Sequence, residues 1–250
     1  MNIAILIQAR MGSTRLPGKV LETIGNEPLI VRVLNELLFV SNASSMQVVT
    51  SNSSKDDILC HVIKNSGFKY YRGDELDVLC RYLSVASKLN VDAVVRVNGD
   101  CPFIDPMLVE NVINYYISNI KNVDYVSTVL DETFPLGMHV EIFSYEALKK
   151  CNEHAVGIER EHVTPFIYNN PHIFRIKNFR SEVDFSEFRL TVDYPEDLVF
   201  SRKLSIMLDA KSEANTPRNQ LDKIITCLRN NPDLVLINSQ FKKSQTIRYT

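Results

Sequence analysis

Glycine and cysteine are scarce in this chain, tryptophan is absent, and neither sign of charge dominates. The 250 residues include eight glycines, five cysteines and no tryptophan, and the formal net charge is −2. Such a chain has no overall basic field, which argues against a nucleic-acid polymer as a partner. No stretch approaches the roughly 18 uninterrupted apolar residues of a membrane span, and Met1 leads into strand-like sequence without a signal peptide. We therefore expect a soluble, cytoplasmic protein with no membrane partner.

The five cysteines stand singly along the chain. None belongs to a CxxC pair, and none has a histidine at metal-ligand spacing beside it. This spacing favours neither a zinc site nor a disulfide framework, and it predicts reduced thiols in the protein core. The residues concerned are Cys60, Cys80, Cys101, Cys151 and Cys227.

The chain does contain a regular alternation of strand-like and helix-like segments, with 45% apolar residues to fill a core. Runs rich in β-branched residues predict strands at Ile3–Ile7, Met46–Thr50, Phe68–Tyr71, Ala93–Val97, Tyr125–Val129, Val140–Phe143, Ile173–Ile176 and Phe188–Val192. Helices are predicted at Leu29–Val40, Asp56–Asn65, Asp77–Leu89, Pro106–Ile120 and Pro195–Leu208. The alternation predicts an α/β fold with a mostly parallel, Rossmann-like sheet flanked by helices, whose ligands bind at the carboxyl ends of the strands.

The rhythm changes after about residue 122. Strand-like and short helix-like segments over 123–184 suggest a small antiparallel elaboration, used for substrate binding or dimerisation, within one domain spanning residues 1–238. The last residues, 239–250, are mostly polar and carry three basic side chains, so we expect a loose C-terminal tail.

A short loop with three cations follows the first predicted strand. Arg10 and Arg15 can each grip phosphate oxygens with two hydrogen bonds, and Lys19 supplies a compact point charge. Ser13 and the backbone amides around Gly12 would complete a cradle for a polyphosphate. The loop is not a Walker A motif, because two apolar residues follow the lysine where that motif has Ser or Thr opening a helix. The alternative is a solvated basic turn.

Two later strands are each predicted to end on an aspartate. Asp100 follows the run 93–97, and Asp193 follows the run 188–192, so both are expected in the same crevice as the basic loop. Carboxylates that face a triphosphate bind it through Mg²⁺, because hard oxygen ligands suit that ion. A turn or helix-capping role is the alternative for each, and Asp105, before a proline, is expected to be the N-cap of the next helix.

Three further residues are weaker candidates. Arg72 and Arg81 flank the exit of the third predicted strand and could touch a base or an acceptor carboxylate, or form surface ion pairs with Asp74 or Asp77. His162 belongs to no zinc motif, and the alternative to a substrate contact is a partly buried helix residue.

The pattern xQARxxSTRLPGKxL from Gln8 to Leu21 resembles the opening signature of cytidylyltransferases that activate sugars as CMP derivatives, such as the 3-deoxy-manno-octulosonate and acylneuraminate enzymes. The chain is more similar still to the spore-coat polysaccharide cytidylyltransferase group, over most of its length. The matching stretches are Arg72–Tyr82, Gly99–Pro102, Phe134–Ser144, Arg160–Pro165 and Thr191–Leu198.

This resemblance implies a nucleotidyltransferase domain of the nucleotide-diphospho-sugar transferase type, usually a homodimer. It implies an enzyme that uses CTP and Mg²⁺, transfers CMP to a nonulosonate- or octulosonate-like sugar acid, and releases pyrophosphate for surface polysaccharide or glycan synthesis. The alternatives are a sugar-phosphate nucleotidylyltransferase, a nucleotide-sugar glycosyltransferase of the same fold, or a non-catalytic nucleotide-binding protein.

The resemblance, carried over position by position, and the residue patterns described above together predict roles for individual residues. The catalytic residues are expected to be Arg10, Lys19 and Asp100, and the metal ligands Asp100 and Asp193. The nucleotide is expected to contact Gln8, Ala9, Arg10, Gly12, Ser13, Arg15, Lys19, Arg72 and Asp100. The acceptor is expected to contact Arg81, His139, Glu141 and His162. The chain departs from its relatives at Met138 and His139, where Leu and Asp are common, and at Cys80, where Asp is common.

Overall fold

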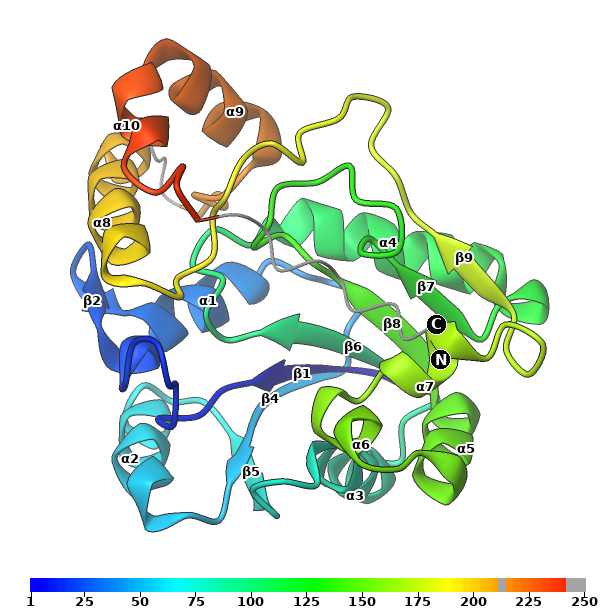
Figure 1. Cartoon of the computed structure of the whole chain (residues 1–250). Coiled ribbons are helices and arrows are strands. Elements are labelled where there is room, and N and C mark those ends of the chain that lie inside the picture. Colours follow the sequence, from blue (N-terminus) through cyan, green and yellow to red (C-terminus); the bar gives the residue numbers. More distant parts are fainter. Residues whose placement is uncertain (211–214, 242–250) are drawn as a thin grey trace.

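A single seven-stranded sheet forms the centre of the molecule (Figure 1). The structure is a computed structural model, and it describes residues 1–210 and 215–241. Along the sheet the strand order is β5–β4–β1–β6–β8–β7–β9. The bounds are β1 Ile3–Gln8, β4 Ser45–Ser51, β5 Tyr70–Gly73, β6 Ala93–Asn98, β7 Tyr125–Ser127, β8 Glu141–Ser144 and β9 Ile176–Asn178. A separate hairpin joins β2, Thr23–Ile24, to β3, Glu27–Pro28.

The sheet is parallel except at one strand. β1 pairs in parallel with β4 and β6, and β8 alone runs antiparallel, to both β6 and β7. Gln8 of β1 lies opposite Val49 and Asn98 in its two neighbours, so these three strands end at the same edge. The predicted mostly parallel sheet with a small antiparallel elaboration is confirmed.

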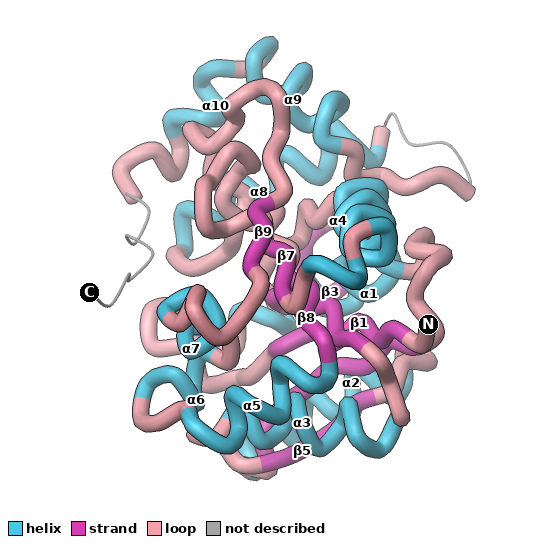
Figure 2. Tube along the Cα trace, turned by 90° about the vertical axis from the view of Figure 1, so that its right-hand side faces the viewer, coloured by secondary structure: helices cyan, strands magenta, loops and turns pink. Residues whose placement is uncertain are grey.

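Helices cover both faces of the sheet, as predicted. Their bounds are α1 Leu29–Leu37, α2 Asp57–Asn65, α3 Val78–Leu89, α4 Pro106–Ser118, α5 Tyr145–His154, α6 Ile158–His162, α7 Pro165–Asn169, α8 Pro195–Asp209, α9 Leu221–Asn230 and α10 Pro232–Leu236. Short 3₁₀ turns are η1 Lys19–Leu21, η2 Ser54–Asp56 and η3 Ile120–Asn122. Figure 2 shows α3, α5 and α6 on one side of the strands and α4, α9 and α10 on the other.

Alternation along β1 explains the two layers. Ile3, Ile5 and Ile7 pack with α1, α4 and α8, whereas Ala4 and Leu6 pack with α3 and α5. Both faces of the strand are buried, as expected for a central parallel strand. Asp105 accepts a hydrogen bond from the Met107 amide at 2.8 Å, so its predicted role as the N-cap of α4 is confirmed.

The predicted strand at 188–192 does not form. This segment makes one isolated parallel bridge, between Leu136 and Arg189, and the Leu190 amide donates to the Leu136 carbonyl. The Val192 amide donates instead to the Asp100 carbonyl at 2.9 Å. The segment therefore hydrogen-bonds to two loops at the carboxyl edge and does not pair with a strand of the sheet. Its β propensity alone predicts its structure wrongly, because these partners are loop residues.

A close backbone approach at Gly137 holds this segment in place. Gly137 has φ +106°, and a Cβ there would lie 2.6 Å from the Thr191 amide nitrogen. Only glycine meets both conditions without strain.

All five cysteines are free, as predicted. Four of them are buried, but Cys80 is exposed, so the predicted core location is wrong for that residue.

The expected C-terminal tail is described only as far as Phe241. This residue stacks on Tyr194 with ring centroids 4.0 Å apart, and residues 242–250 lie outside the described residues. Within the described ranges, the helices are too short or too polar to cross a membrane.

Candidate active site

The basic loop follows β1 and closes on itself. The amides of Ser13 and Gly18 both donate to the Met11 carbonyl at 3.0 Å. Gly18 has φ +75° and precedes η1, a left-handed conformation that glycine adopts without strain. This turn directs Lys19 inward, and only 7% of that residue is exposed.

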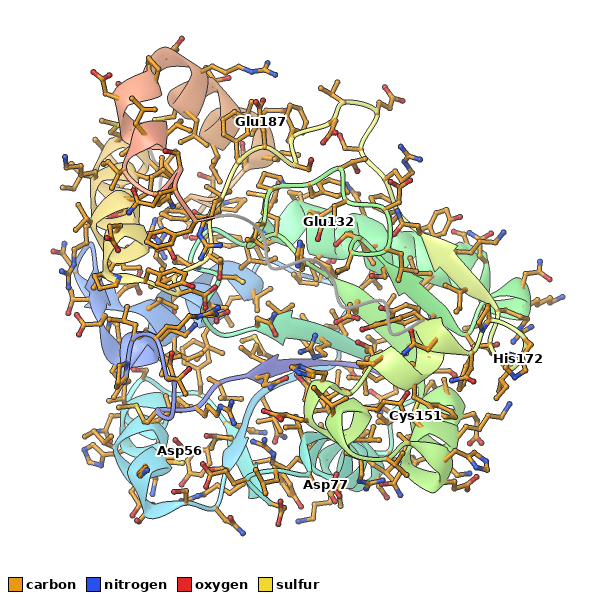
Figure 3. The ribbon with its side chains drawn as sticks, viewed as in Figure 1. Asp56, Asp77, Glu132, Cys151, His172 and Glu187 are labelled. Carbon is orange, nitrogen blue, oxygen red and sulfur yellow. The ribbon has the colours of Figure 1, made fainter. Side chains whose placement is uncertain are left out.

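Asp56 fastens this loop to the neighbouring strand, a role that sequence reasoning missed. Its carboxylate, at the start of α2 (Figure 3), accepts from the Met11 amide at 2.8 Å, from the Thr50 hydroxyl at 2.8 Å and from the Ser51 amide at 3.0 Å. Burial alone would raise the pKa of Asp56, but these hydrogen bonds outweigh it and hold the pKa below its usual value. The available signal was an aspartate at the start of a helix, five residues after the hydroxyl pair Thr50 and Ser51 that ends β4.

Lys19 joins the loop to both predicted metal ligands. Its Nζ lies 2.5 Å from Asp100 Oδ2 and 2.8 Å from Asp193 Oδ1, and it also donates to the Val192 carbonyl at 2.8 Å. Burial alone would lower the pKa of Lys19, but the two carboxylates outweigh it and raise the pKa. The two aspartates, 93 positions apart in the sequence, therefore meet at one ammonium group.

Two arginines complete the charge cluster around Asp193. Arg15 approaches one carboxylate oxygen at 2.6 Å, and Arg189 approaches the other at 3.2 Å. Burial alone would raise the pKa of Asp193, but Lys19 and the arginines outweigh it and lower the pKa. Arg189 is itself held by Asp197, which is fully buried and also accepts from the Asp193 amide at 2.9 Å. Asp197, in the first turn of α8, thus positions the site.

Two adjoining cavities open at this edge of the sheet. The first, of about 360 Å³, is named the nucleotide cavity after the predicted nucleotide contacts in its lining, which consists of Gln8, Ala9, Arg10, Gly12, Ser13, Thr14, Arg15, Lys19, Val20, Asn98, Asp100, His162 and Asp193. The second, of about 490 Å³, is named the acceptor cavity after two predicted acceptor contacts in its lining, His139 and His162, and it shares with the first Arg15, Asn98, Asp100, His162 and Asp193. Its other lining residues include Cys101, Val129, Glu132, Leu136, Gly137, His139, Arg189, Thr191 and Tyr194.

Most of the predicted nucleotide contacts therefore line one cavity, but Arg72 does not. Its guanidinium donates to Asp57 at 2.7 Å and to the Ser51 and Ser53 carbonyls, contacts that brace the end of β4. The assignment of Arg72 to the nucleotide stays a prediction.

Arg10, in contrast, lines the cavity, and its guanidinium lies 3.5 Å from the carboxylate of Glu161 on α6.

The predicted acceptor contacts divide into two groups. His139 and His162 line the acceptor cavity, together with Glu132 of the β7–β8 connection (Figure 3). Arg81 is 2% exposed, and its Nη2 donates to the Glu75 carbonyl at 3.3 Å, so it is no surface ion pair. Glu141 is 5% exposed and lies inside the sheet, outside the lining of either cavity.

Glu141 belongs to a row of polar side chains that crosses the sheet. On β8 its carboxylate accepts from Arg96 of β6 and from the Tyr125 hydroxyl of β7. Arg96 also donates from Nη2 to Gln8 Oε1 at 3.0 Å. Burial alone would lower the pKa of Arg96, but Glu141 outweighs it and raises the pKa.

The donor set suits Mg²⁺ better than a transition metal. In the described part of the chain, no three or more His, Cys, Asp or Glu side chains gather as a metal centre. Mg²⁺ commonly takes one or two carboxylates and completes its shell with substrate phosphates and water. Asp100 and Asp193 fit this requirement, because an oxygen of each lies within hydrogen-bond distance of the same nitrogen.

A parallel sheet with a basic loop after its central strand, and carboxylates facing that loop, is the arrangement of a nucleotidyltransferase fold. Comparison with known proteins then identifies the family. The family model described as cytidylyltransferase matches residues 4–239. The chain therefore belongs to the cytidylyltransferase family.

Individual relatives agree with this assignment. The chain is 32% identical to the spore coat polysaccharide biosynthesis protein SpsF of Bacillus subtilis over 93% of its length and 96% of the relative. It is 33% identical to a 3-deoxy-manno-octulosonate cytidylyltransferase of Trichlorobacter lovleyi over 48% of its length and 46% of the relative. A solved cytidylyltransferase structure from Leptospira borgpetersenii matches with a TM-score of 0.87 and 30% identity, covering 94% of this chain and 97% of the other.

Proposed function

We propose that this protein transfers CMP from CTP to a sugar acid of the nonulosonate or octulosonate type and releases pyrophosphate. The observation that carries the proposal is the meeting of Lys19 with Asp100 and Asp193 at the junction of the two cavities. That junction is where an α-phosphorus must lie if the triphosphate occupies one cavity and the acceptor the other. The names of the relatives support a cytidine nucleotide and a sugar acid.

The chain's own cations would hold the leaving group. An acceptor hydroxyl, the anomeric one in a sugar acid, attacks the α-phosphorus in line and gives up its proton to water, while the bond from that phosphorus to pyrophosphate breaks and its electron pair leaves with pyrophosphate. Arg10, Arg15 and Lys19 line the nucleotide cavity and would neutralise the charge that develops on the departing oxygens. Catalysis of this kind consists of positioning and electrostatic stabilisation.

Asp100 and Asp193 would hold Mg²⁺. When bound, this ion neutralises phosphate charge and makes the α-phosphorus more electrophilic. We therefore propose that the transfer reaction depends on Mg²⁺ and, from the resemblance, that the protein forms a homodimer.

Pyrophosphate release from each of the four nucleoside triphosphates tests the proposal. The assay is run with Mg²⁺, first without an acceptor and then with a panel of sugar acids and a matched panel of sugar phosphates. We expect release from CTP only, and only with a sugar acid present. Release with the sugar phosphates instead, or CTP binding without turnover on any acceptor, would contradict the proposed function.

A further inference from the structure

A buried polar row ends at Gln8, whose side chain lines the nucleotide cavity. It runs from Tyr125 through Glu141 and Arg96 to Gln8, on four neighbouring strands. The side chains of Arg96 and Glu141 are 14% and 6% exposed. A buried ion pair adds little net stability, because removing two charges from water costs about as much as their attraction returns. Stability alone therefore does not account for the row.

Arg96 determines how the Gln8 amide is oriented. A guanidinium has only N–H donors, so the Gln8 side chain must turn its oxygen toward Arg96 whatever the neighbouring groups are. The Gln8 Nε2 group then faces away from Arg96. Within the described ranges this nitrogen has no hydrogen-bond partner and is not buried, and its side chain lines the nucleotide cavity. Gln8 thus offers a fixed donor to a bound nucleotide.

The end of the cavity at Gln8 is better suited to bind the base than to bind the phosphates. Arg15 and Lys19 contact Asp193, and Arg10 lies beside Glu161 of α6, whereas Gln8 and Asn98 supply uncharged amides where β1 and β6 end. With the triphosphate on the cations, the uncharged polar end is left for the nucleoside.

We propose that Arg96 and Glu141 are positioning residues that hold the Gln8 amide as a donor to ring position 3 of the base, so that CTP is favoured over UTP. Cytosine has a lone pair at N3, and uracil has an N–H there. A fixed donor pairs with the first and meets a second donor in the other, which is a strong basis for discrimination. The inference rests on the proposed function only in assuming that the cavity holds a pyrimidine nucleotide.

Binding of CTP and UTP to the full chain with Mg²⁺, measured by calorimetry without an acceptor, tests this inference. The wild type should bind CTP at least about tenfold more tightly than UTP. Gln8→Met keeps the side-chain length but removes the donor, so CTP binding should weaken, UTP binding should stay the same or strengthen because the opposed donor is gone, and the preference for CTP should disappear. Gln47→Met is the matched control, because Gln47 is half-buried on β4 and lines neither cavity. It should keep the wild-type ratio.

Glu141→Gln tests the positioning role separately. This near-isosteric change removes the charge that holds Arg96, so the CTP-to-UTP preference should fall severalfold. In a Gln8→Met background the same change should leave the ratio unaltered, because the positioned group is already gone. A merely structural role would lower the thermal midpoint and leave the ratio intact in both backgrounds, which would overturn the positioning role.

The two proposals fail in different ways. Equal binding of CTP and UTP by the wild type, or a preference that survives Gln8→Met, overturns the base-reading inference and leaves the transfer reaction standing. Preferential CTP binding that Gln8→Met abolishes, with no pyrophosphate released on any acceptor, supports the inference and overturns the proposed transfer.

Discussion

At the scale of single residues, Lys19 makes the contacts that join the halves of the site. It is buried, and its ammonium group lies between Asp100 and Asp193. Without Lys19, each of these partly buried carboxylates would carry a negative charge whose loss of hydration is not compensated by this cation. The sequence could predict the chemistry of these three residues but not their direct contact, which depends on how the 188–192 segment packs.

Lys19→Ala should weaken binding of CTP much more than binding of CMP, because the lysine is proposed to act on the β and γ phosphates. A charge-assisted hydrogen bond is worth about 1.5–3 kcal/mol, so roughly a tenfold or greater difference is expected. Calorimetry with both nucleotides measures it, with Lys55→Ala, an exposed lysine of η2, as the control. Equal losses for CTP and CMP would argue against the assigned role.

Asp56→Asn should destabilise the protein in a pH-dependent way. The folded-state pKa of Asp56 lies below its unfolded value of 3.8, so the stabilisation is fully present above that value and is lost as pH falls through the folded pKa. Urea unfolding should show a deficit of about 1–3 kcal/mol at pH 6–7 that shrinks below about pH 3.8. A deficit that is constant down to pH 3 would contradict the charged role of Asp56.

At the scale of elements, the four strand–helix units of the first half were predictable, because their apolar periodicity agrees with their tertiary surroundings. The helix bounds of α2 and α3 differ from the predictions by one residue each. The second half was less predictable. The 188–192 segment has the composition of a strand, yet its backbone groups bond to Leu136 and Asp100 in two different loops. Contacts that pair loops over a long sequence distance leave no local periodicity to detect.

Gly137→Ala should displace this loop pair and damage the site from a distance. The new methyl group would require φ +106° and a 2.6 Å approach to the Thr191 amide, a combination that costs about 1–3 kcal/mol or more. Thermal unfolding should report the loss of stability, and CTP turnover should fall because Asp193 follows the displaced segment. Gly67→Ala, at φ +83° with open space around the new methyl group, separates strain from clash. Equal effects of the two changes would show that the close approach is unimportant.

At the scale of the whole molecule, the site assembles from segments that are remote in sequence. Loop residues 9–19 and the end of β6 meet at the carboxyl edge of the sheet, as the topology of a parallel sheet requires, and the turn before α8 joins them there. The first two were predictable from the strand–helix alternation of the first half, but the position of the turn before α8 depends on loop contacts of the 188–192 segment. The buried row behind Gln8 was not predictable, because Arg96 and Glu141 lie on antiparallel neighbours whose pairing no local pattern specifies.

The most direct test of the central claim is single-turnover pyrophosphate release from CTP by Asp100→Asn, beside Asp92→Asn, with Mg²⁺ and the sugar acid that supports turnover by the wild type. The two changes are chemically identical and flank opposite ends of β6, with Asp92 exposed at the far edge of the sheet. Thermal unfolding first checks that both variants are folded. Asp100→Asn should then lower the rate of pyrophosphate release by about three orders of magnitude, as loss of a charge-stabilising group at a phosphoryl centre does. Asp92→Asn should retain the wild-type rate. Equal rates in the two variants would contradict the assignment of this edge as the catalytic centre.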